Sequence, residues 1–225
     1  MKKYIIVFLT CSSLLIQYHV IAGKPSFSAY LDGKESEIAV ILCHGRGHDP
    51  RWKVVNPLRR AIHKALGYHT LSLQMPANRN SWREYAQDFP KAYRTIQAGI
   101  DFLKKEKQVR KIYLMGHSMG SRMATAFLAE YPNAGINGFI GVGIRSGGEY
   151  PMDSEQNLRA ISIPVLDVYG NRGDGIDYNQ AERRSDMVSE RYKQVVIQGA
   201  DHQFTSWKHE KEMVRVVIEW LRTKP

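Results

Sequence analysis

The chain has 225 residues, of which 43% are hydrophobic, 24% are charged and 10% are aromatic. This composition is typical of a globular protein and excludes a disordered chain, and the presence of only two cysteines excludes a fold held together by disulfides. The formal net charge is +10 at pH 7, but the lysines and arginines are scattered along the chain, so we expect no nucleic-acid partner.

The first 22 residues have the pattern of a secretory signal peptide. After a short positive segment, residues 4–16 are mostly apolar, and the small residue Ala22 precedes the predicted cleavage site. The apolar run is shorter than the roughly 20 residues that a membrane-spanning helix needs. The sequence therefore predicts an exported protein, periplasmic or secreted, with a signal peptide over residues 1–22 and a single domain over residues 23–225. Lipid attachment at Cys11 stays open as an alternative.

Cleavage at this site removes two lysines and no acidic residue, so the net charge of the mature protein falls from +10 to +8. A moderately basic surface favours at most weak association with an anionic membrane surface. Cys43, at the end of an apolar run, is expected to be buried rather than reactive.

The body of the chain alternates between predicted strands and predicted helices. Buried strands separated by amphipathic helices predict an α/β fold, with a mostly parallel central sheet of about six or more strands and helices on both faces. Functional residues in such sheets gather at the carboxyl ends of the strands. Apolar, β-branched runs predict strands over residues 38–43, 69–73, 112–115, 139–142, 165–169 and 195–197, and three- to four-residue apolar spacing predicts helices over 85–107, 118–132, 157–160 and 213–221, with His63 in a further helix.

The motif Gly116-His117-Ser118-Met119-Gly120 lies between a predicted strand and a predicted helix. A serine in this position occupies a tight, strained turn that exposes its hydroxyl above the sheet, and a side chain at either glycine would collide with a neighbouring strand or helix. The N-terminus of the helix favours negative charge developing at the serine. The motif predicts a nucleophilic serine, with a glycine turn that carries an inert serine as the alternative.

With this motif, residues 36–224 resemble the α/β-hydrolase superfamily. The run from Leu42 to Gly47 (LCHGRG) is similar to the loop that follows the family's third strand and supplies half of its oxyanion hole. The resemblance implies that the backbone N–H groups of Arg46 and Met119 bind the reacting oxygen, and the Arg46 side chain is a candidate to bind an anionic group of the substrate. Only about twenty residues follow the fourth predicted strand before the next one, so we expect no sizeable cap domain and an open cleft.

The resemblance also implies a catalytic histidine and an acid. His202 follows the last predicted strand and precedes the final helix, where the superfamily carries its histidine. Asp174 is the first choice for the acid, although it lies one residue further along its loop than the family pattern, and Asp177 and Glu149 are the alternatives. By contrast, we expect a structural role for Asp167, within its strand, and a loop-shaping role for Asp201.

The family resemblance implies a serine hydrolase that cleaves a carboxylic ester or a related acyl bond through an acyl-enzyme intermediate. We expect a small-molecule acyl substrate, no cofactor and no metal, because no metal or nucleotide motif is present. The alternatives are a hydrolase-fold binding protein without catalytic activity and a basic, surface-associating protein. The choice between ester, thioester and amide, and the oligomeric state, stay open.

Overall fold

The structure is a computed structural model that describes residues 23–26, 28–173 and 175–224. The predicted signal peptide and Cys11 lie outside the described residues, so export and lipid attachment stay predictions of the sequence. Asp174 also lies outside them. No helix within the described ranges has the length and apolar character that crossing a membrane requires.

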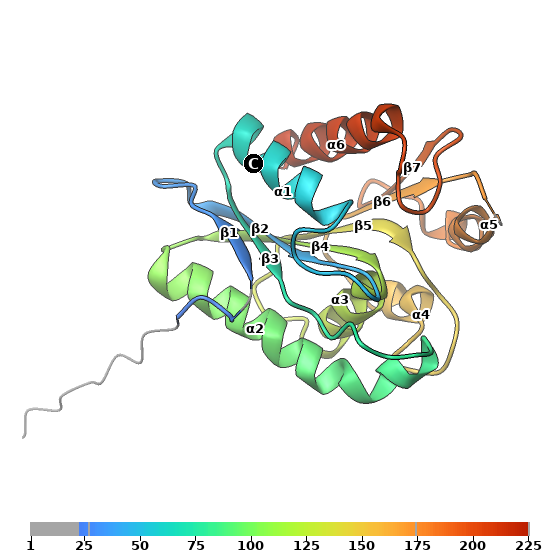
Figure 1. Ribbon diagram of the computed structural model, residues 1–225, viewed down its shortest axis with the longest axis horizontal. Coiled ribbons are helices and arrows are strands. Elements are labelled where there is room, and N and C mark those ends of the chain that lie inside the picture. Colours follow the sequence, from blue (N-terminus) through green and yellow to red (C-terminus); the bar gives the residue numbers. More distant parts are fainter. Residues whose placement is uncertain (1–22, 27, 174, 225) are drawn as a thin grey trace, which may run out of the picture.

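A seven-stranded sheet forms the centre of the described structure, with the strand order β1-β3-β2-β4-β5-β6-β7 (Figure 1). β1 is antiparallel to β3, and the other neighbouring pairs are parallel. The strands are β1 (Ala29–Leu31), β2 (Ile38–Cys43), β3 (His69–Leu73), β4 (Lys111–Ser118), β5 (Gly138–Ile144), β6 (Val165–Gly170) and β7 (Tyr192–Ile197).

Helices cover both faces of this sheet. In Figure 1, α1 and α6 lie on one side, and α2, α3 and α4 lie on the other. The helices are α1 (Val55–Leu66), α2 (Phe89–Glu106), α3 (Met119–Glu130), α4 (Ser154–Arg159), α5 (Ile176–Glu182) and α6 (Trp207–Arg222), with short 3₁₀ helices η1 (Arg83–Asp88) and η2 (Ser185–Met187).

The alternation of side chains along β2 shows why the sheet carries helices on both faces. Val40 and Leu42 pack in the apolar cluster that includes residues of α1 and α6, whereas Ile41 and Cys43 pack in the cluster with α2 and α3. A strand that is buried on both faces must be apolar at every position, because successive side chains point to opposite faces. Cys43 is fully buried, as expected.

The six predicted strands are confirmed, and so is the absence of a sizeable cap. The main difference in helix boundaries concerns residues 85–107, where the structure has the 3₁₀ helix η1 and then α2. Pro90 fits the first turn of an α-helix but cannot supply the N–H that a continuous helix from residue 85 would need there. The strand β1 and the helix α5 were not predicted, because three and seven residues are too few to show a periodic pattern.

The order of the strands fixes the place of the functional site. The chain passes from β2 to β3 on one side of β2 and then returns to form β4 on the other side. In α/β sheets, ligands bind outside the carboxyl ends of the strands where the strand order reverses. In this chain, that point lies between the ends of β2 and β4, at Cys43 and Ser118.

Candidate active site

Ser118 lies at the junction of β4 and α3 with a strained backbone, at φ 53° and ψ −117°. A Cβ atom at Gly120 would lie 2.2 Å from the Cys43 carbonyl oxygen, and one at Gly116 would lie 2.6 Å from the Ser121 Cα. Both distances are far below any van der Waals contact, so the predicted need for glycine at these two positions is confirmed. The backbone turn presents Ser118 at the N-terminus of a well-buried helix.

The loop after β2 packs directly against this turn. A Cβ atom at Gly45 would lie 3.1 Å from the Ser118 Cβ, which shows how closely the two backbones approach. His44 is buried and fixes the loop, because its Nε2 accepts a hydrogen bond from the Met75 N–H (3.0 Å) and its Nδ1 donates to the Gly45 carbonyl (2.9 Å). Burial lowers the pKa of His44, in agreement with a neutral ring in these contacts.

His202 is paired with a carboxylate, and the carboxylate is that of Asp177. The His202 Nδ1 lies 2.8 Å from Asp177 Oδ2 and 3.1 Å from Oδ1. Asp177 is in the first turn of α5, where the helix dipole favours a negative charge. The Arg145 Nη2 lies 3.3 Å from Asp177 Oδ1, so the carboxylate is held from two sides.

The structure thus separates the acid candidates. Asp177, the second choice from the sequence, contacts His202. Asp174, the first choice, lies outside the described residues, and Glu149 is exposed. Asp201 accepts hydrogen bonds from the backbone N–H groups of Gln203 (3.1 Å) and Thr205 (2.9 Å), which confirms that it shapes the His202 loop.

Three further residues adjoin the Asp177–His202 pair, and this role was not predicted from the sequence. His117 is fully buried behind His202 and donates a hydrogen bond from Nε2 to the His202 carbonyl oxygen (3.1 Å). Burial lowers the pKa of His117 well below its ordinary value, and the neighbouring His202 adds to this effect. Gly143 has φ +56°, and a Cβ atom there would lie 2.9 Å from the His202 Nδ1. The third is Arg145, described above; no local sequence pattern marks any of the three as a neighbour of His202.

A partly open cleft of about 590 Å³ contains the candidate residues. Ser118 and His202 both line it, together with Arg46 and Met119, whose backbone N–H groups were the expected oxyanion hole. Among the described residues, the structure records no hydrogen bond between the Ser118 hydroxyl and the His202 ring. Such bonds are often long in unliganded enzymes and tighten when substrate binds. The cleft is lined by Arg46, His48, Trp82, Ser118, Met119, Arg122, Arg145, Ser146, Ile176, Gln180, His202 and Gln203.

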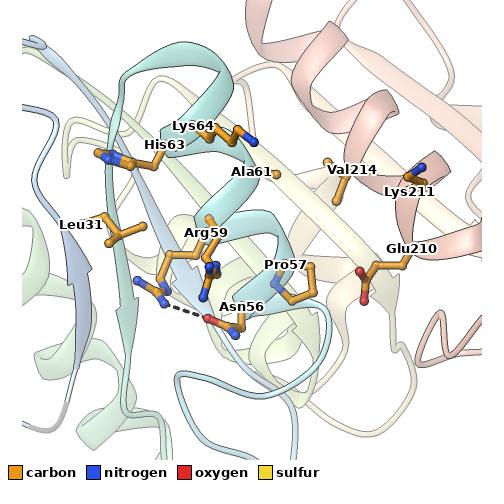
Figure 2. Close-up of a pocket in the computed structure, with 11 residues that line it drawn as sticks. Leu31, Asn56, Pro57, Arg59, Ala61, His63, Lys64, Glu210, Lys211 and Val214 are labelled. Carbon is orange, nitrogen blue, oxygen red and sulfur yellow. Dashed lines mark hydrogen bonds between the residues drawn. The ribbon is translucent and has the colours of Figure 1, made fainter. Parts of the chain in front are cut away.

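A larger hollow of about 860 Å³ lies between α1 and α6 (Figure 2). Figure 2 shows that Asn56, Arg59 and Lys64 belong to α1 and that Glu210 and Lys211 belong to α6, and its dashed line marks the hydrogen bond from Arg59 to Asn56. None of the described residues that line it is a serine, threonine or cysteine. We therefore assign the candidate chemistry to the smaller cleft that contains Ser118. Within the described ranges, no group of three or more histidines, cysteines and acidic residues is arranged to hold a metal ion.

The chain matches the family model of the alpha/beta hydrolase fold over residues 38–161, which is more than half of its length. The protein therefore belongs to the α/β-hydrolase family. A comparison with curated protein sequences gave no match.

Solved structures with a similar fold include proteins described as hydrolases. A dienelactone hydrolase from Anabaena variabilis is 19% identical, with a TM-score of 0.71 over 88% of this chain and 91% of that chain. Est1E from Butyrivibrio proteoclasticus, solved with ferulic acid, is 18% identical, with a TM-score of 0.68 over 88% of this chain and 94% of that chain. An alpha-beta serine hydrolase homologue from Coxiella burnetii is 19% identical, with a TM-score of 0.68 over 86% of this chain and 90% of that chain.

Proposed function

We propose that the protein is a serine hydrolase that cleaves carboxylic esters with Ser118 as nucleophile, His202 as general base and Asp177 as the acid that orients the base. The observation that carries this proposal is the Asp177–His202 pair, at 2.8 Å, in a cleft that also contains Ser118 at its strained turn. The fold of the solved hydrolases supports the reaction class.

The tautomer of His202 follows from its partner. An ionised carboxylate only accepts hydrogen bonds, so Asp177 requires the proton of the neutral ring to be on Nδ1. The Nε2 lone pair is then free to accept the proton of the Ser118 hydroxyl. This is the division of roles in a serine, histidine and aspartate triad, in which the carboxylate fixes the ring and stabilises its charged form.

In the first half of the reaction, Ser118 Oγ attacks the carbonyl carbon of the ester while His202 Nε2 takes the hydroxyl proton. The carbonyl oxygen becomes an oxyanion, and the backbone N–H groups of Met119 and Arg46 are proposed to bind it. His202 returns the proton to the leaving alcohol as the C–O bond breaks, which leaves an acyl group on Ser118. Water then attacks the acyl-enzyme by the same steps and releases the acid.

The substitution Ser118→Ala tests this proposal. We expect wild-type protein to react with a fluorophosphonate probe and to hydrolyse 4-nitrophenyl acetate, and we expect Ser118→Ala to lose labelling and about 10⁴-fold or more of kcat. The matched control is Ser185→Ala, at an exposed serine in η2, which should keep both.

Labelling of Ser118→Ala at the wild-type rate would contradict the proposal. A wild-type protein that neither labels nor hydrolyses esters, with an unchanged fold by circular dichroism, would instead favour the alternative of a hydrolase-fold binding protein.

A further inference from the structure

The cleft around Ser118 has an excess of positive charge. Its described lining includes Arg46, Arg122 and Arg145 but no aspartate or glutamate. Asp177 is not among the lining residues, but its ion pair with Arg145 neutralises one of the three positive charges. The charges of Arg46 and Arg122 remain.

Arg122 is the most deeply held of the three arginines. It is only 6% exposed, and its guanidinium donates to the carbonyl oxygens of Gly147 (2.5 Å), Met152 (2.5 Å) and Ser146 (2.7 Å). The same group lies over the Trp82 ring, 4.7 Å from its centroid. These contacts fix the position of the charge, but all of the partners are neutral.

The charge of Arg122 is therefore not cancelled by a contacting carboxylate. Asp153 attracts it only from beyond ion-pair distance, because the structure gives no ion pair for Arg122 among the described side chains. Burial lowers the pKa of Arg122 to about 10, so the guanidinium still carries its full charge at neutral pH. A cation held in a partly desolvated wall projects a stronger field into the cleft than one in water.

Arg46 adds a second uncompensated cation at the edge of the cleft. Its side chain is exposed, and the described part of the chain gives it no ion-pair partner. Arginine is well suited to bind a carboxylate, because its planar guanidinium matches the two oxygens. An exposed arginine that lines the same cleft as a fixed, buried one is an arrangement that attracts and then holds an anionic group.

We propose that the substrates of this cleft are esters whose acyl part carries a second, anionic group, a carboxylate in the simplest case, which Arg46 binds in the field of Arg122. This inference rests on the proposed function, because it concerns substrates of the same serine. A competing explanation is that the arginines stabilise only the oxyanion, in which case neutral and anionic esters would benefit equally.

A matched pair of substrates separates the two explanations. The 4-nitrophenyl monoester of adipate and 4-nitrophenyl hexanoate have acyl chains of equal length, and they differ in a terminal carboxylate in place of a methyl group. We expect kcat/KM for the adipate ester to exceed that of the hexanoate by about tenfold or more at low salt. The ratio should fall as salt is added, because salt screens charges near solvent.

Two variants assign the effect to the cleft. Arg46→Gln should lower the ratio of the two kcat/KM values by about tenfold. The ratio is the readout because any disturbance of the backbone N–H of residue 46 would affect both substrates equally and cancel. Arg60→Gln removes the same charge from the lining of the hollow between α1 and α6, so it should leave both rates and their ratio unchanged.

Binding without turnover provides a second, independent readout. In Ser118→Ala, adipamate should bind at least tenfold more tightly than hexanamide by titration calorimetry, and Arg46→Gln in that background should remove the difference. If neither ester is hydrolysed by the wild type but adipamate binds as described, the proposed function fails and the anion site stands. A rate ratio near one that responds to neither salt nor Arg46→Gln, or equal binding of the two amides, would overturn the inference.

Discussion

Two buried carboxylates, one within β6 and one in the following helix α5, have opposite relations to the cleft. Asp167, within β6, is fully buried and its Oδ2 accepts from Arg184 Nη2 (2.8 Å) and Nε (3.1 Å) and from the Tyr192 hydroxyl (2.9 Å). Asp177 is nearly as buried, but its partner His202 is 22% exposed and lines the cleft.

The difference shows that burial of a carboxylate does not mark a functional residue. Arg184 is fully buried, so its pair with Asp167 is shielded from solvent, and we assign this pair a role in stabilising the fold. His202 has an imidazole ring, which can act as a general base, and this ring opens onto the cleft that contains Ser118. The two carboxylates therefore differ in whether the partner side chain is exposed to solvent and in whether that partner can act as a base.

The largest expected effect breaks the Asp177–His202 pair. Asp177→Asn keeps the shape of the side chain but can donate a hydrogen bond to Nδ1, which favours the tautomer with the proton on Nε2. We expect kcat for a short activated ester to fall about 10⁴-fold, measured by steady-state kinetics at pH 7.5.

The control for this prediction is Asp174→Asn, at the residue that the sequence alone ranked first. It should retain activity within a few-fold of wild type. The opposite result, with Asp174→Asn inactive and Asp177→Asn active, would reverse the assignment of the acid.

The second prediction concerns the structural pair. Asp167→Ala leaves the buried guanidinium of Arg184 without its carboxylate, so we expect the free energy of unfolding to fall by about 3–5 kcal/mol, measured by urea denaturation. The double substitution Asp167→Leu with Arg184→Met removes both charges, and it should be less destabilising than the single change.

The folded fraction of Asp167→Ala should keep its kcat within a few-fold. A loss of kcat as large as that of Asp177→Asn, with little loss of stability, would show that the two carboxylates do not differ as described.

A smaller effect is expected where the backbone makes room for His202. In Gly143→Ala, the new methyl group would lie 2.9 Å from the His202 Nδ1 and must displace the ring. Misplacement of a catalytic group by about 1 Å can cost about 10²-fold in rate, so we expect a loss of that order in kcat.

Gly67→Ala is the matched control, because Gly67 has a similar positive φ (+71°) with no atom within 4 Å of the added Cβ. Both variants should lose a similar, small amount of stability, and only Gly143→Ala should lose rate. Equal kcat values for the two variants would show that the ring tolerates the methyl group.

The smallest effect concerns three buried histidines in different parts of the fold. Burial lowers the pKa of His44, His69 and His117, so the unfolded chain takes up protons near pH 6.5 that the folded chain does not bind. Stability should therefore decline as the pH falls below about 6.5, with a slope of about 1.4 kcal/mol per pH unit for each such histidine.

Urea denaturation between pH 7.5 and 5.5 measures this slope, and His117→Gln should make it shallower. A slope that His117→Gln leaves unchanged would show that His117 takes up a proton as readily in the folded state.

Much of the fold was predictable because its signals are local. The apolar run of residues 38–43 and the three- to four-residue spacing in the last helix depend on neighbouring residues alone. Short elements such as β1 and α5 have too few residues for such a pattern, and their formation depends on contacts with β3 and with the sheet. Because α5 was not predicted, the sequence offered no reason to prefer Asp177, which this helix carries, over Asp174 as the acid.

By itself, the sequence determined the α/β class, the turn at Ser118 and the candidate histidine, because a glycine-flanked serine between strand and helix and a histidine after the last strand are marked by their immediate neighbours. The tertiary structure decided which carboxylate meets His202, which residues support the pair and that three arginines share one cleft. These features depend on chain segments that are distant in sequence. Only the packing of β5, α5 and the final loops brings Asp177 within hydrogen-bond distance of His202 and Arg145.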